Sequence, residues 1–334
     1  MNTTRKHLTL GISFLSLVLF TAASQAATLK IATLSPDGTS WMKNMRAAAK
    51  EIAKQTNNRV KIKFYPGGVM GDENAILRKM RINQLQGAAV TGGALTSFYK
   101  DANIYGMPFL FNSQQEIIHV RKYMDELILK GLEKKGLISF GLAEAGFAYI
   151  FSNSIIQSVS DLHKYKVWIP DTPAARDAVK AFELSPTPLP LSDVLAGLQT
   201  GLIDTIASPP IASIALQWYT QVKYFTDMPL LYGYGTMVVS KRAMKKIKKD
   251  DRKIVADVMR NVFKEINIQN QKDNIAAIAA IKNQGIKFIT PSSEQLTEWK
   301  SIAAKANERL VNNGFNSKKM FNLIKKHISE FRNK

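Results

Sequence analysis

The chain has 334 residues, of which 46% are hydrophobic and 22% are charged, and its formal net charge is +20. This length accommodates two domains with proper cores, and the composition is that of a globular protein rather than a disordered one. There is no cysteine. Disulfides and cysteine nucleophiles are therefore excluded, and the stability must come from the core.

The first 26 residues have the pattern of a secretory signal peptide. Arg5 and Lys6 form a positive start, residues 8–23 form an apolar core, and residues 24–26 are a small-x-small cleavage site. We expect a periplasmic protein that begins at Ala27, with a net charge of +18 once the two cations are removed. An uncleaved membrane anchor is the alternative. Beyond the signal peptide, no apolar stretch approaches the ~20 residues that span a bilayer.

The first half of the chain alternates predicted strands and helices. Thr28–Leu34 is predicted as a buried strand, a helix begins at Trp41, and Val60–Tyr65 alternates as a strand with one wet face. This order indicates a βαβ unit. The later expected elements are a helix from Gly71 to Ile82, a strand at Gln86–Thr91, a helix at Gln114–Lys134, and strands at Leu137–Leu142 and Phe147–Ser152 separated by Glu144-Ala145-Gly146.

The second half is organised around Asp161–Pro210, which we interpret as the wall of a ligand cleft. It is predicted to contain a strand at Tyr165–Ile169, a helix, a proline-spaced strand and a second helix. A helical pattern from about Asp250 to Asn283 either passes between two domains or is broken at Asn267–Asn274. The remaining expected elements are strands at Gly235–Ser240 and Ile286–Ile289, and helices at Ser292–Asn312 and Ser317–Arg332.

Catalytic motifs are lacking. The histidines that follow the signal peptide, His119, His163 and His327, are not spaced as metal ligands, and neither a G-x-S-x-G elbow nor a P-loop occurs. We therefore expect no enzymatic activity, no metal and no cofactor. Ligands of open α/β sheets bind outside the carboxyl ends of strands, where Trp168 and Ser208 are predicted to lie.

Positive charge is concentrated in two runs, Lys241–Lys253 and Lys318–Lys334. A basic surface of this size attracts nucleic acid or anionic lipid headgroups. We expect no nucleic-acid partner, because an exported protein seldom meets nucleic acid and neither run has the interleaved aromatics of a stacking platform. Two interpretations remain: a solvated helix face, which we favour, and contact with an anionic membrane surface.

Several motifs occur in a fixed order along the chain. They are FYPGGVMGDE at Phe64–Glu73, MPFLF at Met107–Phe111, SVSDLHKYKVW at Ser158–Trp168, LSDVLAGLQTGLIDT at Leu191–Thr205, and the helical region after Asp250. With them, the chain from Leu29 to about Ile289 resembles the DctP-type periplasmic solute-binding subunit of tripartite ATP-independent periplasmic (TRAP) transporters. The resemblance implies a protein that captures a small molecule in a cleft and delivers it to membrane permease subunits, as a monomer or dimer.

The resemblance also implies an α/β fold, a two-lobed periplasmic-binding-protein clamshell with interleaved lobes and a long helix that spans both. Lobe I is expected at residues 27–149 plus 234–273, and lobe II at residues 150–233 plus 274–334.

One position departs from the family pattern. Family members carry D-L-K-G-x-K-x-R, whose arginine pairs with the substrate carboxylate, whereas this chain carries DLHKYKVW, with Trp168 in the arginine position. A second basic position falls near Ala148. An indole supplies an apolar face and one N–H but no charge, so a buried carboxylate would be unpaired. We therefore expect an apolar or amphipathic ligand, lipid-like or aromatic.

The complete set of predicted ligand-binding residues is Leu34, Thr91, Phe147, Ala148, Tyr149, Trp168, Arg176, Leu191, Ser208 and Trp218. Three alternatives stay open. The first is a small organic acid held by a non-standard cation, for which Arg176 in the following helix is the nearest candidate. The second is a permease-independent periplasmic lipid carrier that docks on anionic membrane. The third is a hydrolase or isomerase with an unrecognised site.

Overall fold

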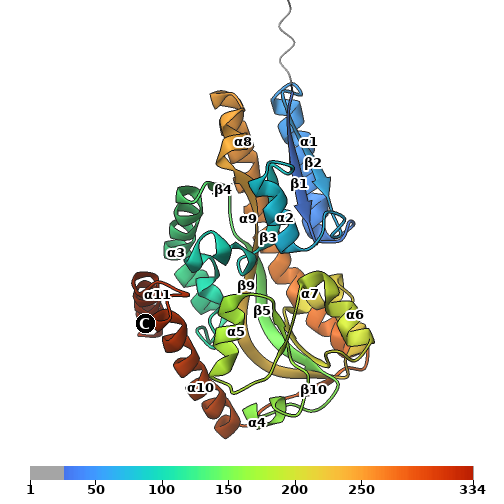
Figure 1. Ribbon diagram of the computed structural model, residues 1–334, viewed down its shortest axis with the longest axis vertical. Coiled ribbons are helices and arrows are strands. Elements are labelled where there is room, and N and C mark those ends of the chain that lie inside the picture. Colours follow the sequence, from blue (N-terminus) through green and yellow to red (C-terminus); the bar gives the residue numbers. More distant parts are fainter. Residues whose placement is uncertain (1–25, 334) are drawn as a thin grey trace, which may run out of the picture.

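The computed structural model describes residues 26–333 (Figure 1). Apart from Ala26, the predicted signal peptide lies outside these residues. Within the described range, no helix combines the length and the apolar character that crossing a membrane requires.

A mixed eight-stranded sheet runs through the molecule in the order β2-β1-β3-β9-β5-β8, with β4 and β10 also paired to β9. The predicted βαβ unit is present, because β1 and β2 are parallel and α1 connects them. β6 and β7 form a separate parallel pair. The strands are β1 (Ala27–Thr33), β2 (Val60–Tyr65), β3 (Gly87–Thr91), β4 (Leu137–Ser139), β5 (Ala143–Ser152), β6 (Trp168–Pro170), β7 (Thr187–Leu189), β8 (Thr205–Ser208), β9 (Tyr224–Ser240) and β10 (Lys287–Ile289).

Two strands are longer than predicted. The expected gap at Glu144–Gly146 is wrong, because these residues belong to β5 and form a bulge in its pairing with β9. Gly146 adopts a φ of 96°, which favours glycine and absorbs the irregularity. The predicted strand at 235–240 is only the end of the 17-residue β9. Pro229 lies in β9 where its pairing with β5 is interrupted, so the missing N–H costs no ladder bond.

Helices cover both faces of the sheet. In the first lobe, α1, α8 and the first half of α9 cover one face, and α2, α3 and α11 cover the other. The second lobe contains α4–α7 and α10 (Figure 1). The α-helices are α1 (Ser40–Gln55), α2 (Glu73–Arg81), α3 (Gln114–Lys134), α4 (Val159–Leu162), α5 (Pro173–Lys180), α6 (Val194–Gln199), α7 (Pro210–Ala215), α8 (Lys241–Lys245), α9 (Lys249–Asn283), α10 (Ser293–Asn312) and α11 (Lys318–Arg332), and the 3-10 helices are Ala94–Ser97, Lys100–Gly106, Leu191–Asp193 and Trp218–Gln221.

The helix α9 is continuous over 35 residues, so the alternative of a break at Asn267–Asn274 is wrong. Phe263 in its first half packs in the core of the first lobe, and Ile281 near its end packs in a core of the second lobe. The helix therefore passes from one lobe into the other, as Figure 1 shows.

The last helix, α11, packs on α3 of the first lobe. Its buried residues Met320, Ile324 and Ile328 belong to the same core cluster as the buried face of α3. The expected second lobe at 274–334 therefore ends in a helix that is packed with the first lobe.

Candidate functional site

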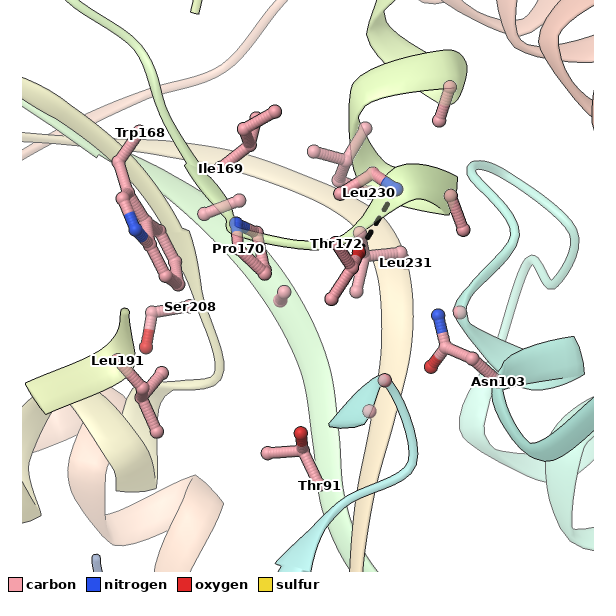
Figure 2. A pocket seen from close by; sticks show the side chains of 18 of the residues that line it. Thr91, Asn103, Trp168, Ile169, Pro170, Thr172, Leu191, Ser208, Leu230 and Leu231 are labelled. Atoms are coloured by element: carbon pink, nitrogen blue, oxygen red, sulfur yellow. Dashed lines mark hydrogen bonds between the residues drawn. The ribbon is translucent and has the colours of Figure 1, made fainter. Parts of the chain in front are cut away.

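A cavity of about 380 Å³ lies where the two lobes meet. Trp168, Leu191 and Ser208 lie on one side of it, and Asn103 lies on the opposite side (Figure 2). Thr91, at the end of β3, faces the same space. The cavity is thus bounded by strand ends and short helices from both halves of the sheet, which is the usual place for ligands in open α/β folds.

The segment that follows β6 builds the apolar wall. The N-cap of α5 is Thr172, whose hydroxyl oxygen accepts a hydrogen bond from the Ala175 N–H at 3.2 Å, and Pro173 occupies the first turn. Three small residues, Ala174, Ala175 and Ala178, then line the cavity. Since they leave room beside the wall and offer no polar side-chain atom, this side suits an apolar group.

The side chain of Trp168 has its polar atom already occupied. Its Nε1–H donates to the Leu189 carbonyl oxygen at 3.0 Å, which adds a side-chain bond between β6 and β7. The ring meets Trp218 edge to face, with centroids 5.6 Å apart, and only 5% of the residue is exposed. Trp168 therefore offers ring carbon atoms to the cavity rather than a hydrogen-bond donor.

Charged side chains are sparse around the cavity and mostly acidic. The lining includes Asp72, Glu73, Asp171 and Lys100, and no arginine of residues 26–333 is part of it. The Glu73 carboxylate accepts hydrogen bonds from the N–H and the hydroxyl of Thr91, at 2.6 and 3.0 Å. Burial raises the pKa of the Glu73 carboxyl, although both bonds oppose the shift. This carboxylate is thus engaged in positioning Thr91.

Six of the predicted site residues line the cavity. They are Thr91, Ala148, Trp168, Leu191, Ser208 and Trp218.

The other four lie elsewhere, and two of them are explained by strand alternation. In β5 the lining residues are Ala145, which lies in the bulge, and the alternating pair Ala148 and Ile150, so the side chains next to this pair turn away from the cavity. Phe147 meets the ring of Tyr232 at 5.5 Å, and Tyr149 stacks on Phe225 at 4.8 Å. Leu34 packs against the core of the first lobe.

The fourth, Arg176, does not line the cavity. The alternative in which Arg176 replaces the family arginine is therefore not supported by any contact with the cavity. Its guanidinium pairs with Asp171 at 2.5 Å, and half of its side chain is exposed. The helix α5 turns its alanines inward, so the position next to Ala175 projects outward.

Several lining residues were missed from the sequence. Ile169, Leu230 and Leu231 border the cavity in Figure 2, and Trp299 of α10 borders it as well. Trp299 donates its indole N–H to the Gln157 carbonyl at 2.9 Å, a contact between distant residues that no local sequence pattern predicts. The alanines that follow Pro173 at helical spacing were the sequence feature that could have indicated a small-residue wall of the cavity at α5.

A second cavity of about 450 Å³ lies between α10, α11 and the segment 108–110. It shares Pro108 with the first cavity, and its lining includes Lys300, Lys325 and Arg332. Arg332 is paired with Glu116 at 2.5 Å. None of the ten predicted site residues borders it, so the cavity at the lobe junction is the candidate site.

An asparagine stripe on α9, formed by Asn267, Asn270 and Asn274, holds the bulge of β5 at residues 144–146. Asn267 Oδ1 accepts from the first N–H of the bulge at 2.7 Å, and Asn270 Nδ2 donates to the carbonyl of the same residue at 2.7 Å. Asn274 Nδ2 donates to the next carbonyl at 3.0 Å, and its Oδ1 accepts from the Ile211 N–H of α7 at 3.2 Å. The stripe thus joins the long helix to the strand and to a helix beside the cavity.

Among residues 26–333, no group of three or more acidic or histidine side chains is arranged to hold a metal ion.

The family model for bacterial extracellular solute-binding protein, family 7 (DctP) matches residues 31–313. A solute-binding protein from Verminephrobacter eiseniae is 23% identical over 290 residues, which are 85% of each chain. The sialic acid-binding periplasmic protein SiaP from Vibrio cholerae is 20% identical over 293 residues, covering 86% of this chain and 90% of SiaP.

Solved structures of similar fold are also periplasmic solute-binding proteins. A TRAP periplasmic solute-binding protein from Xanthobacter autotrophicus with bound β-D-galacturonate has a TM-score of 0.82 at 19% identity, covering 90% of this chain and 99% of that one. The sugar acid binding protein DctPAm from Advenella mimigardefordensis, in complex with galactonate, has a TM-score of 0.84 at 17% identity, covering 92% and 99%. These similarities establish the two-lobed fold. With its family model matched over most of its length, the chain belongs to family 7 of the bacterial extracellular solute-binding proteins.

Proposed function

We propose that this protein captures a solute with a mainly apolar body in the cavity between its lobes and delivers it to the membrane subunits of a TRAP permease. Family membership and fold support the transport role. The apolar ligand rests on one observation in this chain: Trp168, which the sequence resemblance assigns to the arginine position of the family, lines the cavity with its N–H committed to Leu189.

The charges around the cavity support the same choice. A carboxylate entering it would meet Asp72, Glu73 and Asp171, with Lys100 as the only lining cation of the described chain. Burying a carboxylate without a partner costs several kcal/mol. A neutral or amphipathic molecule avoids this penalty and covers the alanines of α5.

A small organic acid is the second candidate, and the bound galacturonate and galactonate of the two solved structures favour it. Those ligands lend no support to an apolar solute. In this chain the cation for an acid would be Lys100, because Arg176 does not line the cavity and is engaged with Asp171. Lys100 is solvent-exposed at the start of a 3-10 helix, so its pairing energy with an acid is weakened by water.

Closure of the two lobes would bring Asn103 and Trp168 toward each other around the solute. We place lobe I at residues 27–149, 234–273 and 318–332, and lobe II at 150–233 and 274–317; this moves α11 to the lobe on which it packs. The connections between them are β5, β9 and α9, and a ligand stabilises the closed form only through contacts that the open form lacks.

The proposal is tested by a thermal-shift and calorimetric screen of the mature protein. The panel contains sugar acids and short dicarboxylates on one side, and neutral aromatic and amphipathic molecules on the other. The expected result is stabilisation by members of the second group alone. Stabilisation by an acid, abolished by Lys100→Ala, would establish the second candidate instead.

A further inference from the structure

The end of the molecule that carries α8 has a dense positive surface that takes no part in lining the cavity. We call it the basic end and define it by Arg242, Lys245, Lys246, Lys248 and Lys249, all of them exposed. They lie on α8, on the connection that follows it, and on the first residue of α9.

The five cations are not neutralised by neighbouring acids. Among residues 26–333 none of them takes part in an ion pair, whereas the flanking Lys241 and Lys253 pair with Glu133 and Asp257 at 3.1 and 2.6 Å. The nearby Asp251 is already paired with Arg59 at 2.7 Å. The positive charge of the basic end is therefore available to an external partner.

The long helix α9 adds to this potential. Lys248 is its N-cap and Lys249 its first residue, and no side chain caps this end of the helix. A helix N-terminus carries about half a positive charge, so cations here are unfavourable for the isolated helix and increase attraction for anions. Asp250 and Asp251 offset only part of this effect.

The scaffold beneath the basic end is fixed and offers no apolar anchor. Ala243, Met244 and Ile247 are at most 4% exposed and belong to the core of the first lobe. None of the large exposed hydrophobic side chains of the described chain lies in 241–253. A partner is thus held by charge at a rigid surface, without insertion of side chains.

The basic end also lies far from the cavity. In Figure 1 α8 is at the upper end of the molecule, whereas α5, α6 and α7 beside the cavity are in the lower half. A partner bound at α8 therefore leaves the cleft free to open and close.

We propose that the basic end docks the protein onto an anionic phospholipid bilayer. Ammonium and guanidinium groups attract lipid phosphates, and the negative potential of an anionic membrane acts on all the cations that lie near its surface. Each cation near such a surface strengthens adsorption by about fivefold. The attraction is screened over about 8 Å at physiological ionic strength, so the docking is reversible and sensitive to salt. Docking keeps the loaded protein close to its membrane partner.

The test compares two variants of the mature protein with equal loss of charge. The first replaces Lys245, Lys246, Lys248 and Lys249 with glutamine. The control replaces four exposed lysines of α11 with glutamine: Lys318, Lys319, Lys325 and Lys326. Binding is measured by co-flotation with vesicles of phosphatidylcholine alone and of phosphatidylcholine mixed with phosphatidylglycerol, at low and at physiological salt.

The wild type is expected to float with the anionic vesicles only. The first variant should lose at least about tenfold in partitioning, and the control less than about threefold. Equal losses in both variants would show that net charge acts rather than this surface, and would overturn the proposal. Retention on DNA or heparin without flotation would overturn it in favour of another polyanion. Thermal unfolding of both variants verifies that they are folded. None of the substituted lysines lines the cavity at the lobe junction, so the flotation result does not depend on the identity of the ligand.

Discussion

The indole Nε1–H of Trp168 donates a hydrogen bond to the carbonyl oxygen of Leu189 at 3.0 Å. The bond joins β6 to β7 and turns the ring carbons toward the cavity. The sequence resemblance predicts that relatives carry an arginine in this position, which would present charge to a carboxylate. In this chain the indole nitrogen of Trp168 stabilises the pairing of β6 with β7, and the apolar face of the ring lines the cavity.

The first prediction concerns Trp168→Arg. This change should weaken binding of the proposed apolar ligand by at least about tenfold, because a guanidinium replaces an apolar surface of the cavity. It should also create measurable affinity for sugar acids, which then have a bidentate partner. Isothermal titration of both ligand classes measures the exchange.

Tyr149→Phe is the control, since Tyr149 stacks on Phe225 and does not line the cavity. It should leave both affinities within about twofold of the wild type, because the change keeps the ring and removes only a hydroxyl that does not border the cavity. Unchanged binding of the proposed apolar ligand by Trp168→Arg would show that this side chain serves the core alone.

The second prediction concerns the asparagine stripe. Asn274→Ala removes the hydrogen bonds to the bulge of β5 and from the Ile211 N–H. Loss of these partners should lower the free energy of unfolding by about 1–2 kcal/mol, because buried backbone groups lose a partner. It should also change the relative position of the lobes in the unliganded protein, measured as a change in the radius of gyration by X-ray scattering.

The neighbouring residue Ile275 supplies the control, since 73% of it is exposed on the same helix. Ile275→Ala should change neither the radius of gyration nor the stability appreciably. If both variants behave alike, the stripe does not set the lobe arrangement.

The third prediction concerns acid stability and Asp161. Desolvation raises the pKa of this carboxyl, but the N–H groups of Gln157 and Ser158, with Lys164 and the Ser158 hydroxyl, outweigh it and lower the pKa from 3.8 to about 2. A depressed folded-state pKa stabilises the fold above the unfolded value and loses this effect as the pH falls through the folded value.

The stability difference between wild type and Asp161→Asn should therefore be constant at neutral pH and disappear between pH values of about 4 and about 2. Thermal unfolding across this range measures it. A difference that persists unchanged to the lower limit would mean that the ionised carboxylate is not what stabilises α4.

Sequence patterns predicted the elements that depend on local chemistry. The helix α9 follows from a long periodic stretch without proline or glycine. The asparagines of the stripe did not break it, because each of their side chains bonds to β5 and only that of Asn274 also bonds within the helix, to the Asn270 carbonyl. The position of Trp168 in the cavity wall follows from a motif and a strand end. What failed depends on distant contacts: the bulge at 144–146 requires α9, and α11 packs on α3.

Side-chain direction was the weakest inference. Their position near a strand end predicts Phe147 and Tyr149 in the cleft. The alternation of side chains in β5 instead turns Ala148 and Ile150 toward the cavity. Arg176 was chosen for its distance in sequence, whereas the helical phase of α5 and the nearby Asp171 decide its direction. Trp299 could not be found, because it reaches the cavity from α10 through packing alone.

The identity of the solute tests the central claim most directly. The protein is purified from the periplasm without added ligand, examined by native mass spectrometry, and then extracted with solvent so that the released molecule can be identified. We expect a neutral or amphipathic molecule with an apolar body, which is lost in Trp168→Arg. Recovery of a small organic acid, with no hydrophobic molecule bound, would contradict it.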